Sequence, residues 1–293
     1  MTEHASLRLH LDPAAFAEAV RYTAAATGFD VRLVEKDYYC TLVLEKLAVA
    51  EGLVFKGGTC LAKVHAGFHR ISEDLDFVIS TPADATRGHR RSGVAPVKAA
   101  FDELPRRQPA LRVVEPLSGA NASTQYLGSL AYTSVFTRRD ETIKIEVAMR
   151  EPLLVAPVIG SAASILLDPL GGAPLVERVS LRCITLIEAL AEKLRAALSR
   201  RAPAIRDFFD TDWAVGHDLL DPLDATLIGL VRSKLAVPGN AAVDVSPERL
   251  VALRRQLELG LQPVLRQADF DAFDLDRAFT IVSEMAAKIG APR

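Results

Sequence analysis

Apolar residues recur at helical spacing in two segments near the start of the chain. Residues 13–27 are rich in alanine, and Gly28 provides a helix stop. Residues 31–50 place leucine and tyrosine side chains at near-helical spacing and predict a second helix. A short apolar run at residues 53–55 then ends at two glycines, which predicts a strand followed by a turn.

The segments that follow alternate between helix and strand patterns. Residues 59–66 predict a helix with Thr59 near its N-cap, and residues 94–104 predict another helix. Alternating or β-branched segments predict strands at residues 74–79, 111–115, 126–137 and 142–149. This region therefore predicts a sheet with accompanying helices.

The pattern changes after about residue 184. Four segments there have helical periodicity and few strand signals: ITLIEALAEKLRAALSR, IRDFFDTDWAVGHDLL, PERLVALRRQLELG and DLDRAFTIVSEMAAKIG. The stretch 152–177, which contains proline and glycine, predicts a connector. The expected fold class is α+β, with a mixed α/β domain over residues 1–183 that includes the N-terminal helices, followed by a helical C-terminal domain over residues 184–293.

Composition and charge are those of an ordinary globular protein. With 293 residues, 49% of them hydrophobic and 25% charged, the chain can bury a sizeable core. A net charge of -2 argues against a generally basic nucleic-acid coat, although a local basic patch is compatible with it. Three scattered cysteines are too few for a disulfide framework or a zinc site. The polar N-terminal segment and the lack of a long apolar run predict a cytoplasmic protein with no membrane partner.

Asp74 and Asp76 form an acidic pair in one predicted strand. Side chains at i and i+2 of a strand share a face, so both carboxylates point to one side and the apolar residues to the other. Glu146 lies on the polar face of a later predicted strand. If the two strands are neighbours, roughly 4.8 Å apart, the three carboxylates converge. A divalent metal is the usual resolution of such repulsion, and Mg²⁺ or Mn²⁺ held there suits an NTP and an attacking hydroxyl.

The glycine turn before this strand adds a candidate phosphate site. Gly57 and Gly58 carry no β-carbon that would keep a ligand away, and the helix that follows offers free backbone N–H groups. The Thr59 hydroxyl could donate to a phosphate oxygen. The spacing matches neither a P-loop nor a G-x-G-x-x-G motif.

Each of these signals has an ordinary alternative. An Asp-x-Asp pair is more often the solvated edge of a strand, and Glu146 alone could be an exposed residue paired with Lys144. The two glycines could form a plain strand-to-helix turn. The combination of a glycine turn with three carboxylates favours the metal interpretation.

These features resemble the signature of the DNA polymerase β-like nucleotidyltransferases. That signature is a GG or GS turn after a strand, a helix, an Asp-x-Asp on the next strand and a third carboxylate on a later strand. Five segments resemble, more narrowly, the AbiEii-like nucleotidyltransferase toxins, which include the MenT toxins of mycobacteria: VEKDYYCTLVLEKL (34–47), FKGGTCLAKV (55–64), RISEDLDF (70–77), IKIEV (143–147) and EKLRAALSRRAPAIRDFFD (192–210). The resemblance runs in order over residues 34–210, and the remainder matches only in being helical.

The resemblance implies a polymerase β-like nucleotidyltransferase core and a helical domain that completes the active-site cleft. It implies that Lys193 neutralises the triphosphate and that Asp207 and Asp210 form the last acidic motif. The residues expected in nucleotide binding are Lys56, Gly57, Gly58, Thr59, Ser72 and Lys193; those expected in metal binding are Asp74, Asp76 and Glu146. The equivalence of Glu146 to the third carboxylate is the least direct of these matches.

The same resemblance implies a toxin of a toxin–antitoxin or phage-defence system. Such a toxin transfers nucleotides from an NTP to the 3′ end of tRNA and so blocks aminoacylation and translation. Its expected partners are the tRNA acceptor end, the NTP and a cognate antitoxin encoded nearby.

A locally basic segment fits a polyanion. Between Arg182 and Arg206 there are six lysine or arginine residues and two glutamates. The candidate RNA contacts are Arg195, Arg200, Arg201 and Arg206. The alternative is a solvated helix face, and for Asp207 it is a helix-start role or an ion pair with Arg206 or Arg201.

Other functions remain compatible with these residues. The acceptor could be an antibiotic hydroxyl or a protein side chain, although extra acidic residues would be expected around a cationic drug. A non-catalytic nucleotide- or RNA-binding module is also compatible, but the intact carboxylate set with Lys193 argues against it. Ser72 lies two residues before Asp74, where a phosphate would weaken metal binding. Its ordinary alternative is a serine that ends the loop by hydrogen bonding.

Overall fold

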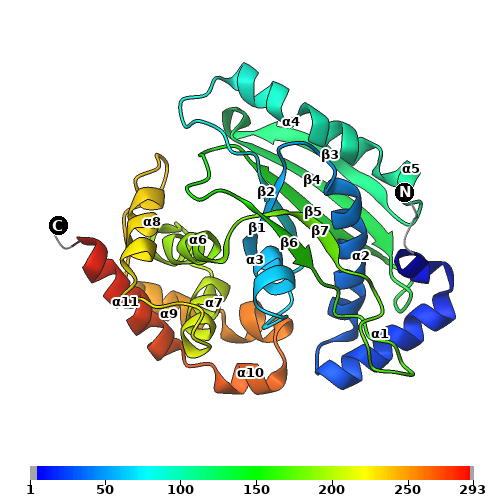
Figure 1. Ribbon diagram of the computed structural model, residues 1–293. Helices are drawn as coiled ribbons and strands as arrows, with labels where there is room; N and C mark the ends of the chain where they lie inside the picture. The colour runs from blue at the N-terminus through cyan, green and yellow to red at the C-terminus, as the bar shows by residue number, and fades with distance from the viewer. Residues whose placement is uncertain (1–4, 291–293) are drawn as a thin grey trace. The chain divides into compact units, whose positions relative to one another are not determined.

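The computed structural model describes residues 5–290, and the chain divides into two compact units, Met1–Ile184 and Thr185–Arg293 (Figure 1). The first unit contains a mixed β-sheet with helices, and the second is helical. This arrangement confirms the expected α+β class. Among the described residues, no helix is both long and apolar enough to span a membrane.

The helices of the first unit lie at its N-terminal end and between its strands. They are η1 (Ala5–Leu11), α1 (Pro13–Thr27), α2 (Val31–Leu47), α3 (Gly57–Cys60), η2 (Leu61–His65), α4 (Arg87–Asp102), α5 (Leu104–Arg107) and η3 (Asn121–Ser123). Side-chain oxygens of Asp12 and Asp30 accept backbone N–H groups at the starts of α1 and α2. Gly28 ends α1 in the left-handed conformation, with φ of 79°.

Seven strands form one mixed sheet in the order β3-β4-β5-β2-β1-β7-β6. Their bounds are β1 (Val54–Lys56), β2 (Leu75–Val78), β3 (Arg112–Ala120), β4 (Gln125–Thr133), β5 (Asp140–Ala148), β6 (Val158–Ala162) and β7 (Val179–Cys183). β2 pairs in parallel with β5, and β1 in parallel with β7, whereas the other neighbours are antiparallel. The strands on either side of the glycine turn, β1 and β2, are therefore interior neighbours in the sheet.

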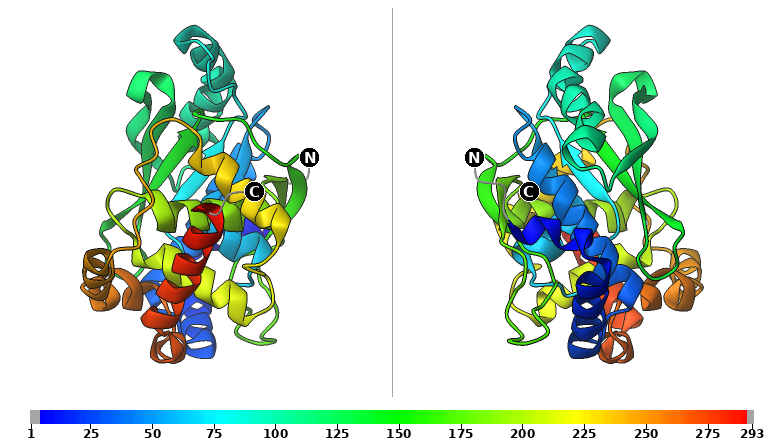
Figure 2. Two further views of the ribbon diagram at one scale, coloured as in Figure 1. Left: turned by 90° about the vertical axis from the view of Figure 1, so that its left-hand side faces the viewer. Right: turned by 90° about the vertical axis from the view of Figure 1, so that its right-hand side faces the viewer.

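The two faces of the sheet differ in polarity. Phe55, Phe77 and Val147 are neighbours in register on one face, and all three are buried. Tyr39 of α2 stacks on Tyr132 of β4, with ring centroids 3.9 Å apart, so α2 covers this apolar face. Figures 1 and 2 show α2 along the sheet. The alternate, more polar positions of the central strands point to the opposite face.

The second unit consists of helices around α6. Its elements are α6 (Leu186–Ser199), α7 (Ile205–Gly216), α8 (Ala225–Leu235), α9 (Pro247–Arg254), η4 (Leu257–Leu261), η5 (Gln262–Val264), α10 (Gln267–Ala272) and α11 (Leu275–Gly290). Two buried cations hold α6 in place. Lys234 Nζ lies 2.8 Å from Glu188 Oε1 and 3.2 Å from Glu192 Oε1. Arg249 donates to the Ala197 carbonyl near the other end of α6, at 2.8 Å.

A buried ion pair joins α2 to the segment after the glycine turn. Lys63 Nζ lies 2.6 Å from Asp37 Oδ1, and the two side chains are 1% and 2% exposed. Lys63 also donates to the Thr41 hydroxyl and the Ala163 carbonyl, and Asp37 accepts a hydrogen bond from the Ser164 hydroxyl. These contacts satisfy both charged groups, which is the condition under which a buried pair is tolerated.

Two strands were not predicted from the sequence. β6 and β7 lie within or beside the stretch 152–177, which was expected to be a connector. β6 is short and mostly exposed, and it contains Gly160, at which a β-carbon would lie 2.5 Å from Cys183 Sγ. Glycine is needed there for close pairing with β7, but it removes the β-branched signal that a strand usually carries.

Two helix starts also differ from the prediction. The helix after the strand begins at Gly57 rather than at Thr59, and Gly57 enters it in a left-handed conformation, with φ of 77°. α4 begins at Arg87 rather than at residue 94, and the Thr86 hydroxyl caps it by accepting the His89 N–H. The other predicted strands are confirmed to within a few residues at most ends, although β3 extends to Ala120.

Replacing Lys63 with methionine is expected to lower the free energy of unfolding by about 3–5 kcal/mol, because Asp37 would remain buried without its cation. The matched control is Arg106→Met, since the exposed pair of Arg106 with Glu103 contributes at most about 1 kcal/mol. Urea unfolding followed by far-UV circular dichroism measures both. Equal stability of the two variants would show that the buried pair does not stabilise the fold.

Candidate active site

Three charged residues lie in one row across the centre of the sheet. Lys56 of β1 pairs with Asp76 of β2, and Asp76 pairs with Glu146 of β5. Adjacent strands are about 4.8 Å apart, so these side chains leave the same face as immediate neighbours. All three residues are half-buried. The expected adjacency of the two carboxylate-bearing strands is therefore confirmed.

Asp74 lies just ahead of β2, two residues before Asp76. The Thr59 hydroxyl donates to the backbone carbonyl of Asp74, and Thr59 is 1% exposed. The expectation that Thr59 lies near the helix N-cap is wrong, whereas its expected contact with a phosphate stays a prediction. Lys56 occupies the N-cap position, and the Thr59 hydroxyl instead fixes the backbone that carries Asp74.

Gly57 is required by close packing within the protein itself. Its φ is 77°, a left-handed conformation that favours glycine, and a β-carbon there would lie 2.2 Å from Asp76 Oδ2. The sequence suggested that this glycine leaves room for a ligand. The structure shows instead that the space of the missing β-carbon is taken by the carboxylate of Asp76, which packs directly on the turn.

Gly58 makes room for a buried arginine that was not predicted. A β-carbon on Gly58 would lie 2.7 Å from Arg70 Nη2 and 3.0 Å from Ser72 Oγ. Arg70 is only 2% exposed, so its guanidinium is a fixed cation against the turn. The signal available in the sequence was its position in RISEDLDF, four residues before Asp74.

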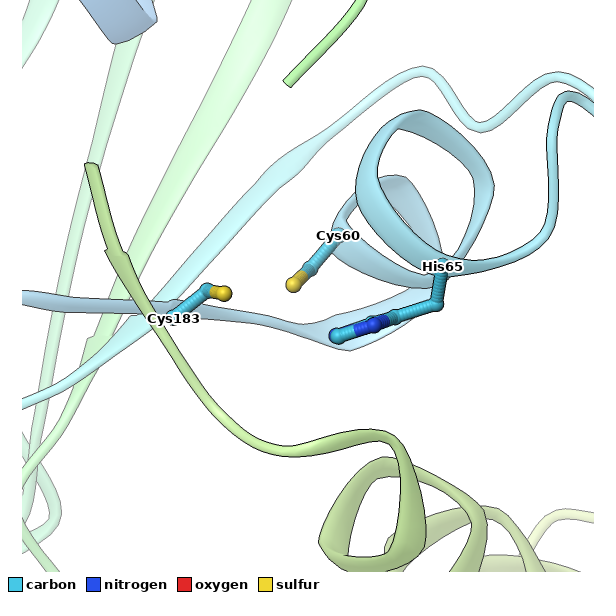
Figure 3. A group of neighbouring side chains, drawn as sticks. All are labelled: Cys60, His65 and Cys183. Atoms are coloured by element: carbon cyan, nitrogen blue, oxygen red, sulfur yellow. The ribbon is translucent and has the colours of Figure 1, made fainter. Parts of the chain in front are cut away.

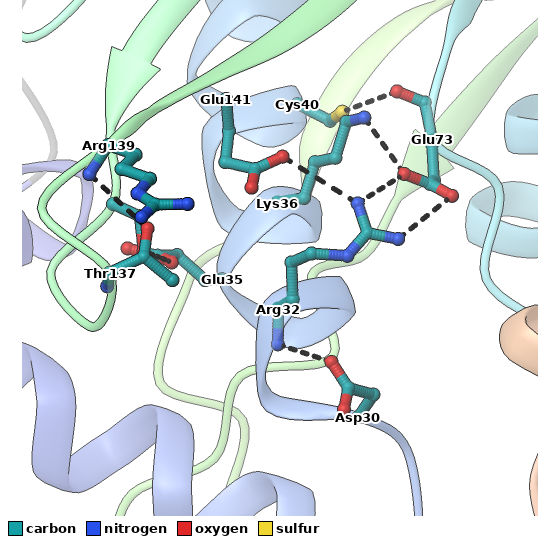
Figure 4. A network of polar contacts seen from close by, with 10 residues as sticks. Asp30, Arg32, Glu35, Lys36, Cys40, Glu73, Thr137, Arg139 and Glu141 are labelled. Carbon is teal, nitrogen blue, oxygen red and sulfur yellow. Dashed lines mark hydrogen bonds and ion pairs between the residues drawn. The ribbon is translucent and has the colours of Figure 1, made fainter.

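A second unpredicted network holds the loop before β2 against α2 (Figure 4). Arg32 donates to both carboxylate oxygens of Glu73, at 2.8 and 3.3 Å, and Lys36 Nζ lies 2.9 Å from Glu73 Oε2. Burial raises the pKa of Glu73, but the hydrogen bonds from Arg32 and Lys36 outweigh it and lower the pKa to about 2. Because Glu73 precedes Asp74 directly, this network positions the acidic pair.

Another acidic residue shown in Figure 4, Glu35, fixes a different segment. Its carboxylate accepts hydrogen bonds from the Ser134 hydroxyl and the Val135 N–H, both at 2.7 Å. Burial raises the pKa of Glu35, and these two hydrogen bonds oppose the rise. Glu35 therefore joins α2 to the turn after β4 and has a structural role.

The helical unit brings together the other expected site residues. Lys193 Nζ of α6 lies 3.0 Å from Asp207 Oδ1 and 2.8 Å from Asp210 Oδ2, both on α7. Arg200 Nη1 lies 3.1 Å from Asp207 Oδ2. Asp207 therefore does form ion pairs, but its partners are Lys193 and Arg200 and not Arg206 or Arg201 as considered from the sequence. Asp210 is fully buried, so its carboxylate positions the Lys193 ammonium.

The candidate RNA contacts differ in exposure. Arg200, Arg201 and Arg206 are exposed, whereas Arg195 is half-buried. The basic surface of this segment is therefore formed by the three exposed arginines around the end of α6 and the start of α7.

The site residues thus form two groups, one within each unit. In the first unit the carboxylates adjoin a glycine turn, and in the second a lysine is held by two aspartates. A family model described as "Nucleotidyl transferase AbiEii toxin, Type IV TA system" matches residues 42–281. The chain belongs to the AbiEii nucleotidyl transferase toxin family. This result confirms the family expected from the sequence motifs.

Two solved structures are similar to this chain in fold. The crystal structure of JHP933 from Helicobacter pylori matches with a TM-score of 0.53 and 16% identity, covering 89% of this chain and 93% of that chain. A putative nucleotidyltransferase from H. pylori gives the same TM-score and identity, with 89% and 96% covered. A comparison with curated proteins gives no match.

Removing the Glu73 charge is expected to destabilise the protein in a pH-dependent way. The pKa of about 2 lies below the usual value of 4.5, so the stabilisation is fully present above about pH 5 and is lost as the pH falls towards 2. At pH 7, Glu73→Gln is expected to lower the free energy of unfolding by about 2–3 kcal/mol. The difference between wild type and variant should shrink below about pH 4.5.

Chemical denaturation at a series of pH values between 7 and 3 measures this difference. Glu18→Gln, an exposed substitution on α1, is the control for simple loss of charge. A difference for Glu73→Gln that stays constant over this range would contradict the assigned network.

Proposed function

We propose that this AbiEii-family chain is a metal-dependent nucleotidyltransferase toxin that transfers nucleotides from an NTP to the 3′ end of tRNA and so blocks translation. The observation that carries the proposal is the row of Lys56, Asp76 and Glu146 beside the glycine turn. Its substrates, NTP and tRNA, are cytoplasmic, and the proposed place of action is the cytoplasm. The proposed regulatory partner is a cognate antitoxin encoded nearby.

The donor set of the first unit fits Mg²⁺ or Mn²⁺. Asp74, Asp76 and Glu146 offer carboxylate oxygens, which are the ligands that these hard cations prefer. With Lys56 alongside, three carboxylates and one ammonium carry a net charge of about -2, which one divalent ion balances. When bound, the metal would neutralise triphosphate charge and lower the barrier to attack by a hydroxyl.

The chain's own residues hold the candidate metal-binding carboxylates in fixed positions. Asp76 is fixed by its packing on Gly57 and by its register with Glu146. Asp74 is fixed through the Thr59 hydroxyl and through its neighbour Glu73. Fixed geometry of this kind matters because the enzyme's contribution to phosphoryl and nucleotidyl transfer is mostly positioning and charge stabilisation.

We assign to Lys193 the binding of a phosphate oxygen, the role that its family motif implies. An ammonium has three N–H donors, and Asp207 and Asp210 accept two of them. In the described part of the chain, the third donor has no protein partner. Asp207 and Asp210 then act as positioning residues, and Arg200 shares Asp207 with the lysine.

Incubation with each α-labelled NTP, Mg²⁺ and total tRNA tests the reaction. We expect label at the 3′ end of tRNA with at least one NTP, and no label when EDTA is added. Asp76→Asn and Lys193→Met are each expected to reduce incorporation by about a hundredfold or more, since each removes charge stabilisation from the transition state. Asp102→Asn, an exposed change at the end of α4, is the matched control and should retain full activity.

Three results would contradict this assignment. Label on protein instead of RNA would show that the acceptor is a protein side chain. Label on a small molecule would show that the acceptor is a small-molecule hydroxyl. The absence of label with every NTP would favour a binding module without catalysis.

The exposed arginines are expected to contact the tRNA backbone. Replacing Arg201 and Arg206 together with alanine should weaken binding of all tRNAs to a similar extent. The slope of log K against log salt concentration should fall in magnitude by about 2, one unit for each phosphate that the variant no longer neutralises. Filter binding over a salt series measures the slope. Arg254→Ala, which removes an exposed partner of Asp276, is the control, and an unchanged slope in the double variant would place the RNA elsewhere.

A further inference from the structure

Two cysteines and a histidine gather at the far end of the glycine-turn helix (Figure 3). Cys60 is the last residue of α3, His65 ends η2, and Cys183 ends β7. One ligand atom from each residue, two Sγ atoms and a ring nitrogen, lies within 4.8 Å of the others. Both cysteines are fully buried, and His65 is half-buried. The cluster lies wholly within the first unit and uses none of the candidate active-site residues.

The fold creates this cluster from distant positions in the chain. Cys183 lies opposite Phe55 in the parallel pairing of β7 with β1, the strand that leads into the glycine turn. Cys60 then follows that turn directly. Two of the three cysteines that are scattered along the sequence are therefore neighbours in space. Cys40, the third cysteine, contacts the Glu73 carbonyl instead.

The distances suit a tetrahedral metal. With Zn–S bonds of about 2.3 Å, two thiolates on one tetrahedral zinc lie roughly 3.8 Å apart. The observed separations, at most 4.8 Å, require the ligands to close by no more than about 1 Å. Small side-chain rotations supply such a shift.

One ring nitrogen of the histidine is held by a hydrogen bond to a backbone carbonyl. His65 Nε2 lies 3.0 Å from the Ile184 carbonyl, which can only accept, so Nε2 carries the hydrogen in this contact. Nδ1 then keeps its lone pair. A metal-binding histidine commonly donates its other ring N–H to a backbone carbonyl, which fixes the tautomer. Binding through Nδ1 preserves this hydrogen bond, whereas binding through Nε2 replaces it.

We propose that Cys60, His65 and Cys183 bind a thiophilic divalent ion of the zinc class, distinct from the oxygen-liganded Mg²⁺ or Mn²⁺ proposed for the carboxylates. Three protein ligands leave the fourth position to water. The ion joins the end of the glycine-turn helix to β7, so its binding stabilises the segment that places Gly57 beneath Asp76.

Cobalt substitution tests the site in the full chain. The purified protein is stripped with chelator and reductant and then titrated with Co²⁺. We expect thiolate-to-cobalt charge-transfer absorption and tetrahedral d–d bands that saturate at one cobalt per chain, and that added Zn²⁺ abolishes. Cys183→Ser should remove the charge-transfer signal or weaken cobalt binding by more than about tenfold, and His65→Gln should weaken it similarly. Zn²⁺ should raise the midpoint of thermal unfolding of the wild type.

Two controls separate this site from others. Cys40→Ser removes the cysteine outside the cluster, and Asp76→Asn removes a carboxylate of the proposed Mg²⁺ site; both should retain the cobalt spectrum. Far-UV circular dichroism of each stripped variant shows whether it is folded. If Cys183→Ser does not fold, His65→Gln still tests the site.

Several results would overturn the proposal. One is the absence of a charge-transfer band when Co²⁺ is added to protein whose three thiols are all reduced. Another is a cobalt spectrum that is identical in the wild type and in every cysteine variant. A third is a Cys60–Cys183 disulfide, detected by non-reducing mass spectrometry, in a protein that takes up no cobalt after reduction. None of these results bears on nucleotide transfer, which the Asp76→Asn assay tests separately.

Discussion

The parallel pairing of β2 with β5 is the constraint on which the candidate site depends. It places Asp76 beside Glu146, and a shift of one residue would turn one of them to the other face of the sheet. Two such carboxylates repel by roughly 3 kcal/mol at about 5 Å with an effective dielectric of 20. Burial of each large apolar side chain contributes about 1.5–3 kcal/mol, so the buried residues of the same strands outweigh this repulsion. They are Leu75, Phe77, Ile145 and Val147. The carboxylates are thus held together by the apolar face beneath them.

Helix α2 supports both ends of the glycine-turn motif with opposite charges. Its Asp37 carboxylate forms an ion pair with Lys63, which lies in the segment after the turn. Its Arg32 and Lys36 side chains donate hydrogen bonds to Glu73, which lies in the loop before β2. Because α2 is also buried against the sheet, the turn and the acidic pair have a common rigid base. This explains why Lys36 and Asp37 are buried, since each has a partner in a segment that leads to the site, whereas the buried Glu35 holds the turn after β4.

The sequence predicted those parts of the fold that depend on local pattern. The alternation of DLDF and IKIEV was enough to place Asp76 and Glu146 on one face, since side-chain direction in a strand has a period of two. β6 was missed because Gly160 and exposure remove the usual strand signal. The contact that the Thr59 hydroxyl makes with the Asp74 carbonyl was missed for another reason. A hydroxyl beside a glycine turn can donate to a ligand or to the backbone, and the sequence does not show which backbone acceptor lies within reach.

The cysteine–histidine cluster and the carboxylate row both involve one short helical segment, residues 57–65. Gly57, on which Asp76 packs, begins the segment, and His65 ends it. The ligands of the two groups select different cations, because thiolate and imidazole favour zinc-like ions whereas carboxylates favour Mg²⁺ or Mn²⁺. Under the two proposals, a metal on the thiolates and imidazole therefore need not compete with one on the carboxylates. It would stabilise the turn while the carboxylates exchange their own cation with each nucleotide.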